Sequence, residues 1–119
     1  MSKWMTIAAL VSVSVLGISS AAADPVGGPK ADHTRVEANS TDVFKVDCWG
    51  DEVTAFRIQG DGDTDLDLYV YDEDGNLISS GTGYSDREEV QVRPHYRQTM
   101  TIKVVNRGNV YNAYSIQVW

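Results

Sequence analysis

The chain has 119 residues, a formal net charge of −7 at pH 7 and one cysteine. Nucleic acids and anionic membranes are bound through clusters of Lys and Arg, so an acidic protein of this kind is not expected to bind either. A single cysteine cannot close a disulfide within the chain, so the fold must be held together by its core or by a bound ion. We therefore expect one small domain.

Residues 1–23 show the order of features of an export signal. Lys3 is followed by an apolar stretch and then by small residues that end at Ala23. This stretch is too short for a membrane-spanning helix, which needs about 20 apolar residues, and no later segment approaches that length. We predict a signal peptide cleaved near Ala23, a secreted or periplasmic protein and no membrane span.

Residues 24–40 contain two prolines, two glycines and little apolar periodicity. Such a composition is typical of a flexible segment, because Pro and Gly interrupt regular structure and few side chains are available for a core. We predict a mobile N-terminal tail at residues 24–40 and a folded domain at residues 41–119.

Apolar and polar residues alternate within the predicted domain, as expected for strands with one buried face. In residues 66–71, Leu66, Leu68 and Val70 face one side while the intervening residues face the other. Similar alternation predicts strands at 44–48, 52–60, 76–79, 88–94, 99–106 and 113–119. About seven short strands and no helical periodicity indicate an all-β fold, a small antiparallel β-sandwich.

Cys48 and the two tryptophans near the ends of the predicted domain have structural interpretations. The neighbours of Cys48 are acidic, so no basic group lowers the pKa of its thiol, and we expect a small buried residue. Trp49 and Trp119 are expected to cover the edges of the sandwich.

No catalytic motif is present in the sequence. The two histidines, His33 and His95, lie far apart, and the motifs of serine hydrolases, zinc peptidases and phosphate-binding loops are missing. We predict that the protein is not an enzyme.

An aspartate run from residue 61 onward raises the question of a calcium site. Asp61, Asp63 and Asp65 begin like an EF-hand loop, but the sixth position is Leu66 instead of the required glycine. A looser site remains open, in which these three aspartates and backbone carbonyls bind Ca²⁺. The alternative is that the aspartates stay solvated while Asp65 accepts backbone hydrogen bonds. No cofactor is required by either interpretation.

Tyrosines are the best candidates for a binding surface. Tyr69 and Tyr71 face away from the predicted core, and Tyr84, Tyr96 and Tyr111 come from other strands or loops. If several converge, they suit a carbohydrate or a protein surface. Otherwise they stack across neighbouring strands.

Two segments, "DGDTDLDLYVYDEDGNLI" at 61–78 and "IKVVNRGNVYNAYSIQV" at 102–118, resemble the bacterial pre-peptidase C-terminal domain family. This resemblance implies a jelly-roll-like sandwich without catalytic residues that assists export, solubility or attachment to a substrate. Calcium-binding relatives place one ligand just before the first strand, a position that Asp42 occupies here.

The sequence therefore predicts an exported, non-catalytic accessory or adhesion module. One alternative is a calcium-stabilised domain that binds carbohydrate or protein. Another is a peptidase inhibitor or a chaperone for a secreted enzyme.

Overall fold

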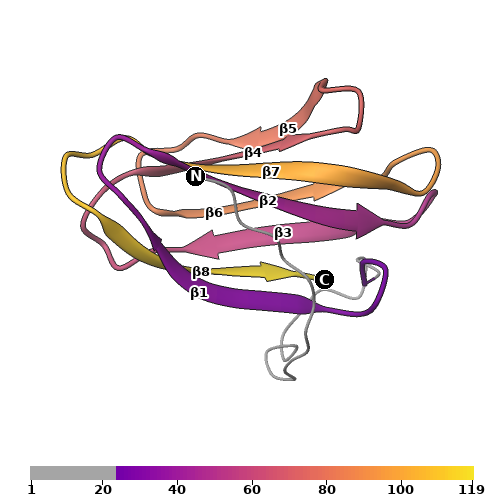
Figure 1. The fold of residues 1–119 in the computed structure, drawn as a ribbon, viewed down its shortest axis with the longest axis horizontal. Coiled ribbons are helices and arrows are strands. Elements are labelled where there is room, and N and C mark those ends of the chain that lie inside the picture. The colour runs from indigo at the N-terminus through magenta and orange to yellow at the C-terminus, as the bar shows by residue number, and fades with distance from the viewer. Residues whose placement is uncertain (1–23) are drawn as a thin grey trace.

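The protein is a sandwich of two four-stranded antiparallel sheets (Figure 1). The computed structural model describes residues 24–119, and residues 1–23, predicted as a signal peptide, lie outside them. The strands are β1 (Lys30–Val36), β2 (Thr41–Cys48), β3 (Thr54–Gln59), β4 (Leu66–Tyr71), β5 (Leu77–Gly81), β6 (Arg87–Val92), β7 (Gln98–Asn106) and β8 (Asn112–Val118). Sheet I has the order β1-β8-β3-β6, and sheet II has the order β2-β7-β4-β5. The predicted fold class is confirmed, with one more strand than expected.

The additional strand, β1, lies within the segment that was predicted to be a flexible tail, so that prediction was wrong for residues 30–36. The strand pairs with β8 along its whole length, from Lys30 opposite Val118 to Val36 opposite Asn112. Only these two end residues of β1 are buried. Alternation was absent because an edge strand can be held by backbone hydrogen bonds to its neighbour without burying one face.

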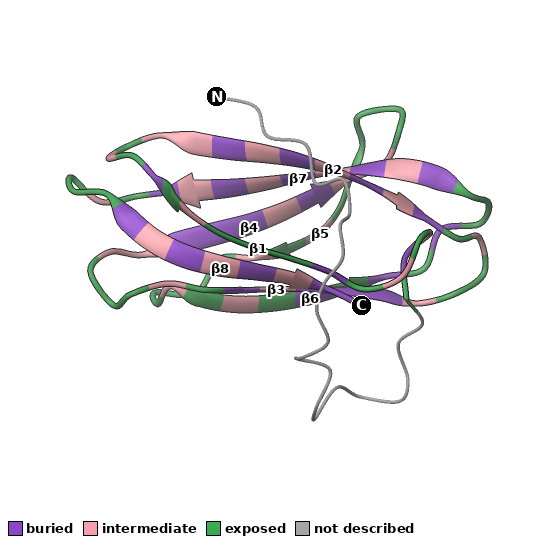
Figure 2. Ribbon diagram, turned by 60° about the horizontal axis from the view of Figure 1, so that its bottom comes forward, coloured by how far each residue is buried: buried purple, intermediate pink, exposed green. Residues whose placement is uncertain are grey.

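The core lies between the sheets and consists of the residues that alternate along the strands (Figure 2). Leu66, Leu68 and Val70 are completely buried, as the sequence predicted. Replacing one of these leucines by Ala should cost about 2–5 kcal/mol, because it removes apolar contacts and leaves a cavity. The cluster comprises Val36, Phe44, Val46, Cys48, Phe56, Ile58, Leu66, Leu68, Val70, Val90, Val92, Met100, Ile102, Val104, Tyr114, Ile116 and Val118.

Two polar side chains within this interior are paired with each other. The Tyr114 hydroxyl donates a hydrogen bond to Asp42 Oδ2 at 2.7 Å, and Asp42 is only 4% exposed.

Cys48 is also buried, and burial raises the pKa of its thiol to about 11. The thiol is therefore protonated at neutral pH and a poor nucleophile, in agreement with its predicted structural role.

The connecting loops gather at the two ends of the sandwich. We call one the aspartate end, which consists of residues 37–40, 60–65, 82–86 and 107–111. The other is the aromatic end, which consists of residues 49–53, 72–76 and 93–97 with the exposed residues Leu77 and Ile78 that follow the turn. Residues 24–119 contain no helix that could span a membrane.

Candidate functional site

The predicted metal residues lie in the β3–β4 loop of the aspartate end, where Asp61 is bound by the backbone. Its Oδ2 accepts a hydrogen bond from the Ala113 N–H at 2.9 Å, and its Oδ1 accepts one from the Asp63 N–H at 3.0 Å. These bonds favour the charged carboxylate and lower its pKa, with the Ala113 bond as the largest cause. Asp61 therefore fastens the loop to the start of β8.

Asn112 completes this attachment from inside the protein. Its side chain is fully buried, and its Nδ2 donates to the Thr64 carbonyl at 3.3 Å and to Asp86 Oδ2 at 3.0 Å. Its Oδ1 accepts a bond from the Asp61 N–H at 3.1 Å, and Asp86 Oδ2 also accepts one from the Gly62 N–H. One buried amide at the start of β8 thus joins two loops, residues 60–65 and 82–86, which gives these polar residues a structural role.

Asp65 and Asp67 each have one buried carboxylate oxygen, Oδ1, without a hydrogen-bond partner in residues 24–119. The other oxygen of Asp67 accepts a bond from Arg107 Nε at 2.8 Å. Desolvation raises the pKa of Asp65, and the charge of Asp67 raises it further. The backbone hydrogen bonds that the sequence suggested for the Asp65 carboxylate do not form within residues 24–119.

Within residues 24–119, no three His, Cys, Asp or Glu side chains are close enough together to hold a metal ion. Calcium binding by Asp61, Asp63 and Asp65 stays a prediction. Asp42, the second position considered for calcium, lies within β2 and accepts the Tyr114 hydrogen bond.

Three loops meet at the aromatic end. The Asp51 N–H donates to the Pro94 carbonyl at 2.7 Å, and the Glu73 N–H donates to Gln98 Oε1 at 3.1 Å. Gly50 permits this approach, because a Cβ at this position would lie 2.5 Å from the Cα of Tyr96. The loops therefore form one continuous surface.

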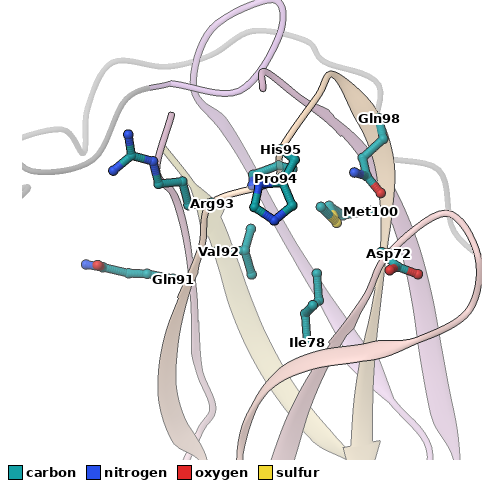
Figure 3. A pocket seen from close by; sticks show the side chains of 9 residues that line it. All are labelled: Asp72, Ile78, Gln91, Val92, Arg93, Pro94, His95, Gln98 and Met100. Atoms are coloured by element: carbon teal, nitrogen blue, oxygen red, sulfur yellow. The ribbon is translucent and has the colours of Figure 1, made fainter. Parts of the chain in front are cut away.

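A pocket of about 310 Å³ opens at this end, between the edge strands of the two sheets (Figure 3). Val92, Met100 and Ile78 supply apolar atoms, and His95 points toward the same space. Ile78 is 45% exposed, so the apolar lining reaches the surface. Polar and apolar residues contribute about equally to the lining, and pockets that combine apolar atoms with polar groups are typical of ligand sites. The remaining lining residues are Asp72, Gln91, Arg93, Pro94 and Gln98.

Two exposed aromatic side chains of the aromatic end are held in position by charged neighbours. The Arg97 guanidinium lies 5.1 Å from the centre of the Trp49 ring, and it is 3.5 Å from Asp47 Oδ2. The Tyr96 hydroxyl donates to Glu73 Oε2 at 2.8 Å, and this bond is the main reason that the pKa of Tyr96 is raised. Rigid aromatic side chains lose little conformational entropy on binding a partner.

Only one of the five candidate tyrosines lies at the aromatic end. Tyr69 and Tyr71 are on β4, where Lys103 lies 4.9 Å from the Tyr71 ring. Tyr84 and Tyr111 are in loops of the aspartate end. Trp49, which is 40% exposed, lies at the same end as Tyr96, whereas Trp119 is buried.

The two histidines also occupy different places. His33 lies on β1, with Nδ1 at 3.1 Å from Ser115 Oγ, while His95 lines the pocket.

Comparison with known proteins finds no matching family model and no matching curated protein. Solved structures are similar, among them the pre-peptidase C-terminal domain of a collagenase from Bacillus anthracis, with a TM-score of 0.59, 12% identity and coverage of 75% of this chain and 87% of that chain. A periplasmic inhibitor of g-type lysozyme from Aeromonas hydrophila has a TM-score of 0.58 and 9% identity, and the match covers 99% of this chain and 97% of that chain. A mitogen from Yersinia pseudotuberculosis has a TM-score of 0.57 and 10% identity, and the match covers 79% of this chain and 85% of that chain. At these identities the similarity establishes the fold alone, a β-sandwich like those of these three structures.

Proposed function

We propose that the protein is an exported, non-catalytic recognition module that binds a protein partner through its aromatic end. The observation that carries this proposal is the pocket, which Ile78 helps to line, at the end of the sandwich whose loops also carry the exposed residues Trp49, Tyr96 and Leu77. Exposed apolar and aromatic groups that gather beside a pocket are characteristic of interaction sites. The fold is compatible with this role, because similar structures include a pre-peptidase C-terminal domain and a lysozyme inhibitor.

The chemistry of the pocket favours a protein over a carbohydrate at this end. The pocket has polar lining residues, but Val92, Met100 and Ile78 form an apolar part that offers no hydrogen bonds to sugar hydroxyls and matches an aliphatic or aromatic side chain. Leu77, which precedes Ile78 in the chain, is also 54% exposed at this end. Binding energy in protein interfaces is concentrated where one anchoring side chain enters such a pocket.

The mechanism is recognition without bond making. The partner contributes an apolar anchor, and the aromatic side chains cover it at the rim and exclude water. The proposal that the protein is exported rests on the signal peptide predicted at residues 1–23. An exported module would meet its partner in the periplasm or outside the cell.

The test begins with capture of a partner from the envelope of the native host by the purified chain. The partner is then identified and titrated with three variants by isothermal calorimetry. Trp49→Ala and Tyr96→Ala should each weaken binding at least about tenfold, because they remove rim contacts. Tyr84→Ala is the matched control, because Tyr84 is fully exposed at the opposite end. Equal binding by all variants, or no captured protein, would contradict the proposal.

Activity of the captured partner separates the specific roles that remain. If the partner is a hydrolase and the pure chain abolishes its turnover at saturation, the module is an inhibitor. Unchanged turnover with retained binding identifies an accessory or adhesion module. If the yield of folded partner enzyme rises when the two proteins are produced together, the module is a chaperone.

A further inference from the structure

A polar groove of about 550 Å³ runs along β8 on the outer face of sheet I. Ala113 and Ser115 form its floor, because they are the short side chains of this central strand. His33 on β1 and Gln59 on β3 stand directly opposite Ser115 on either side. The groove therefore results from short residues on one strand between longer residues on its two neighbours.

The hollow continues toward the edge of the sheet. A second depression of about 420 Å³ adjoins the groove and shares Arg57 and Gln59 with it. Its remaining lining residues are Arg87, Glu88 and Glu89. Since Gln59 is opposite Arg87 in the β3–β6 pairing, polar side chains cross all four strands of sheet I. Three strand spacings of roughly 4.8 Å make this row long enough for an extended ligand.

Several polar groups in the groove are available to a ligand. The side-chain amides of Gln59 and Gln117 form no hydrogen bond within residues 24–119, and each amide offers donors and acceptors. Arg57 is fixed by a 3.0 Å bond from its Nε to Glu89 Oε1 and by the Trp119 ring, 4.9 Å from its guanidinium carbon. This arrangement holds the guanidinium in place while its terminal nitrogens remain able to donate.

We propose that this groove binds a neutral oligosaccharide. Six of its eight lining residues carry hydrogen-bonding side chains, which match a ligand covered with hydroxyl groups: His33, Arg57, Gln59, Asp61, Ser115 and Gln117. A peptide anchor would find no apolar pocket here, in contrast to the aromatic end. A polyanionic chain is disfavoured, because Glu89 neutralises Arg57 and the protein carries a net charge of −7. The groove lies on a different face from the aromatic end, so this site does not depend on the proposed protein partner.

The test is a ¹⁵N NMR titration of the purified chain with defined hexasaccharides. The neutral probes are oligomers of β-1,4-glucose, β-1,4-xylose and β-1,4-N-acetylglucosamine, and the charged probe is an oligomer of α-1,4-galacturonate. At least one neutral probe should shift resonances of Ser115, Gln59 and Gln117 at concentrations below about 10 mM. A stronger response to the galacturonate oligomer would contradict the proposal that the ligand is neutral. No response to any neutral probe would contradict the proposal that the groove is an oligosaccharide site.

Variants locate the binding. The double change Gln59→Ala and Gln117→Ala should weaken the best neutral probe at least tenfold, because it removes the free amides. Ser115→Trp should abolish binding by filling the floor of the groove. Thr101→Trp is the matched control, because Thr101 occupies the outer face of the central strand β7 of sheet II. Each variant must first give the NMR spectrum of a folded protein. Binding of the neutral probe that survives in both groove variants would contradict the proposal.

Discussion

The two ends of the sandwich use polar residues for opposite purposes. At the aspartate end, the carboxylates of Asp61 and Asp86 and the amide of Asn112 bind the loops to one another. At the aromatic end, Arg97 and Glu73 hold Trp49 and Tyr96 while much of each ring stays exposed. The comparison teaches that a conspicuous polar motif can serve the fold, while ordinary loop residues present a binding surface.

The largest expected effect comes from breaking the attachment at the aspartate end with Asn112→Ala. The change leaves several buried donors and acceptors unpaired, and it should lower the free energy of unfolding by about 2–3 kcal/mol. Urea denaturation measures the loss. Asn109→Ala, an exposed asparagine of the neighbouring loop, is the control and should change stability by less than about 0.5 kcal/mol. Equal effects of the two changes would refute the structural role of Asn112.

A smaller effect is expected from Asp61→Asn, because only one of its two hydrogen bonds is lost. At pH 7 the variant should be less stable by about 1 kcal/mol or less, as the residue is exposed. The folded pKa of Asp61 lies below its ordinary value of 3.8, so its contribution is complete above that value and disappears as pH falls through the lower folded pKa.

Thermal melting of the wild type and of Asp61→Asn between about pH 7 and pH 2 tests whether the stabilisation by Asp61 is lost on acidification. The difference between wild type and Asp61→Asn should narrow only on the acidic side of 3.8. A difference that grows on acidification would show that the carboxylate is not stabilised by its backbone donors.

At the aromatic end, Trp49→Ala should reduce stability by less than about 1 kcal/mol, because the ring is partly exposed and its main partner is a surface arginine. The same change is expected to reduce partner binding strongly. Measuring both quantities on one sample sharpens the comparison of the ends. A loss of stability as large as that of Asn112→Ala would indicate a structural role for Trp49.

The smallest expected effect is that of calcium. The Asp61 oxygens already accept backbone N–H groups, so we expect melting midpoints with about 1 mM calcium and with excess chelator to coincide within about 1 °C. A higher midpoint with calcium that Asp61→Asn and Asp63→Asn remove would support the predicted calcium site instead.

Much of the fold could be predicted because burial on one face of a strand leaves a period of two in the sequence. Leu66, Leu68 and Val70 are one example, and Tyr114 with Ile116 is another. β1 escaped prediction because an edge strand held by backbone pairing needs no such period. The aromatic end was not predicted either, since Trp49 and Tyr96 are 47 residues apart and reach the same end only because the loop at Gly50 packs against the backbone of Tyr96.

The sequence by itself determined that the protein is an acidic β-sandwich with a buried thiol, because these properties follow from composition and local alternation. Only the tertiary structure decided which polar residues fasten loops and which surfaces are hollow. Those outcomes depend on how strands from distant parts of the chain align, and pairing register places Ser115 between His33 and Gln59 without leaving a signal in any one segment.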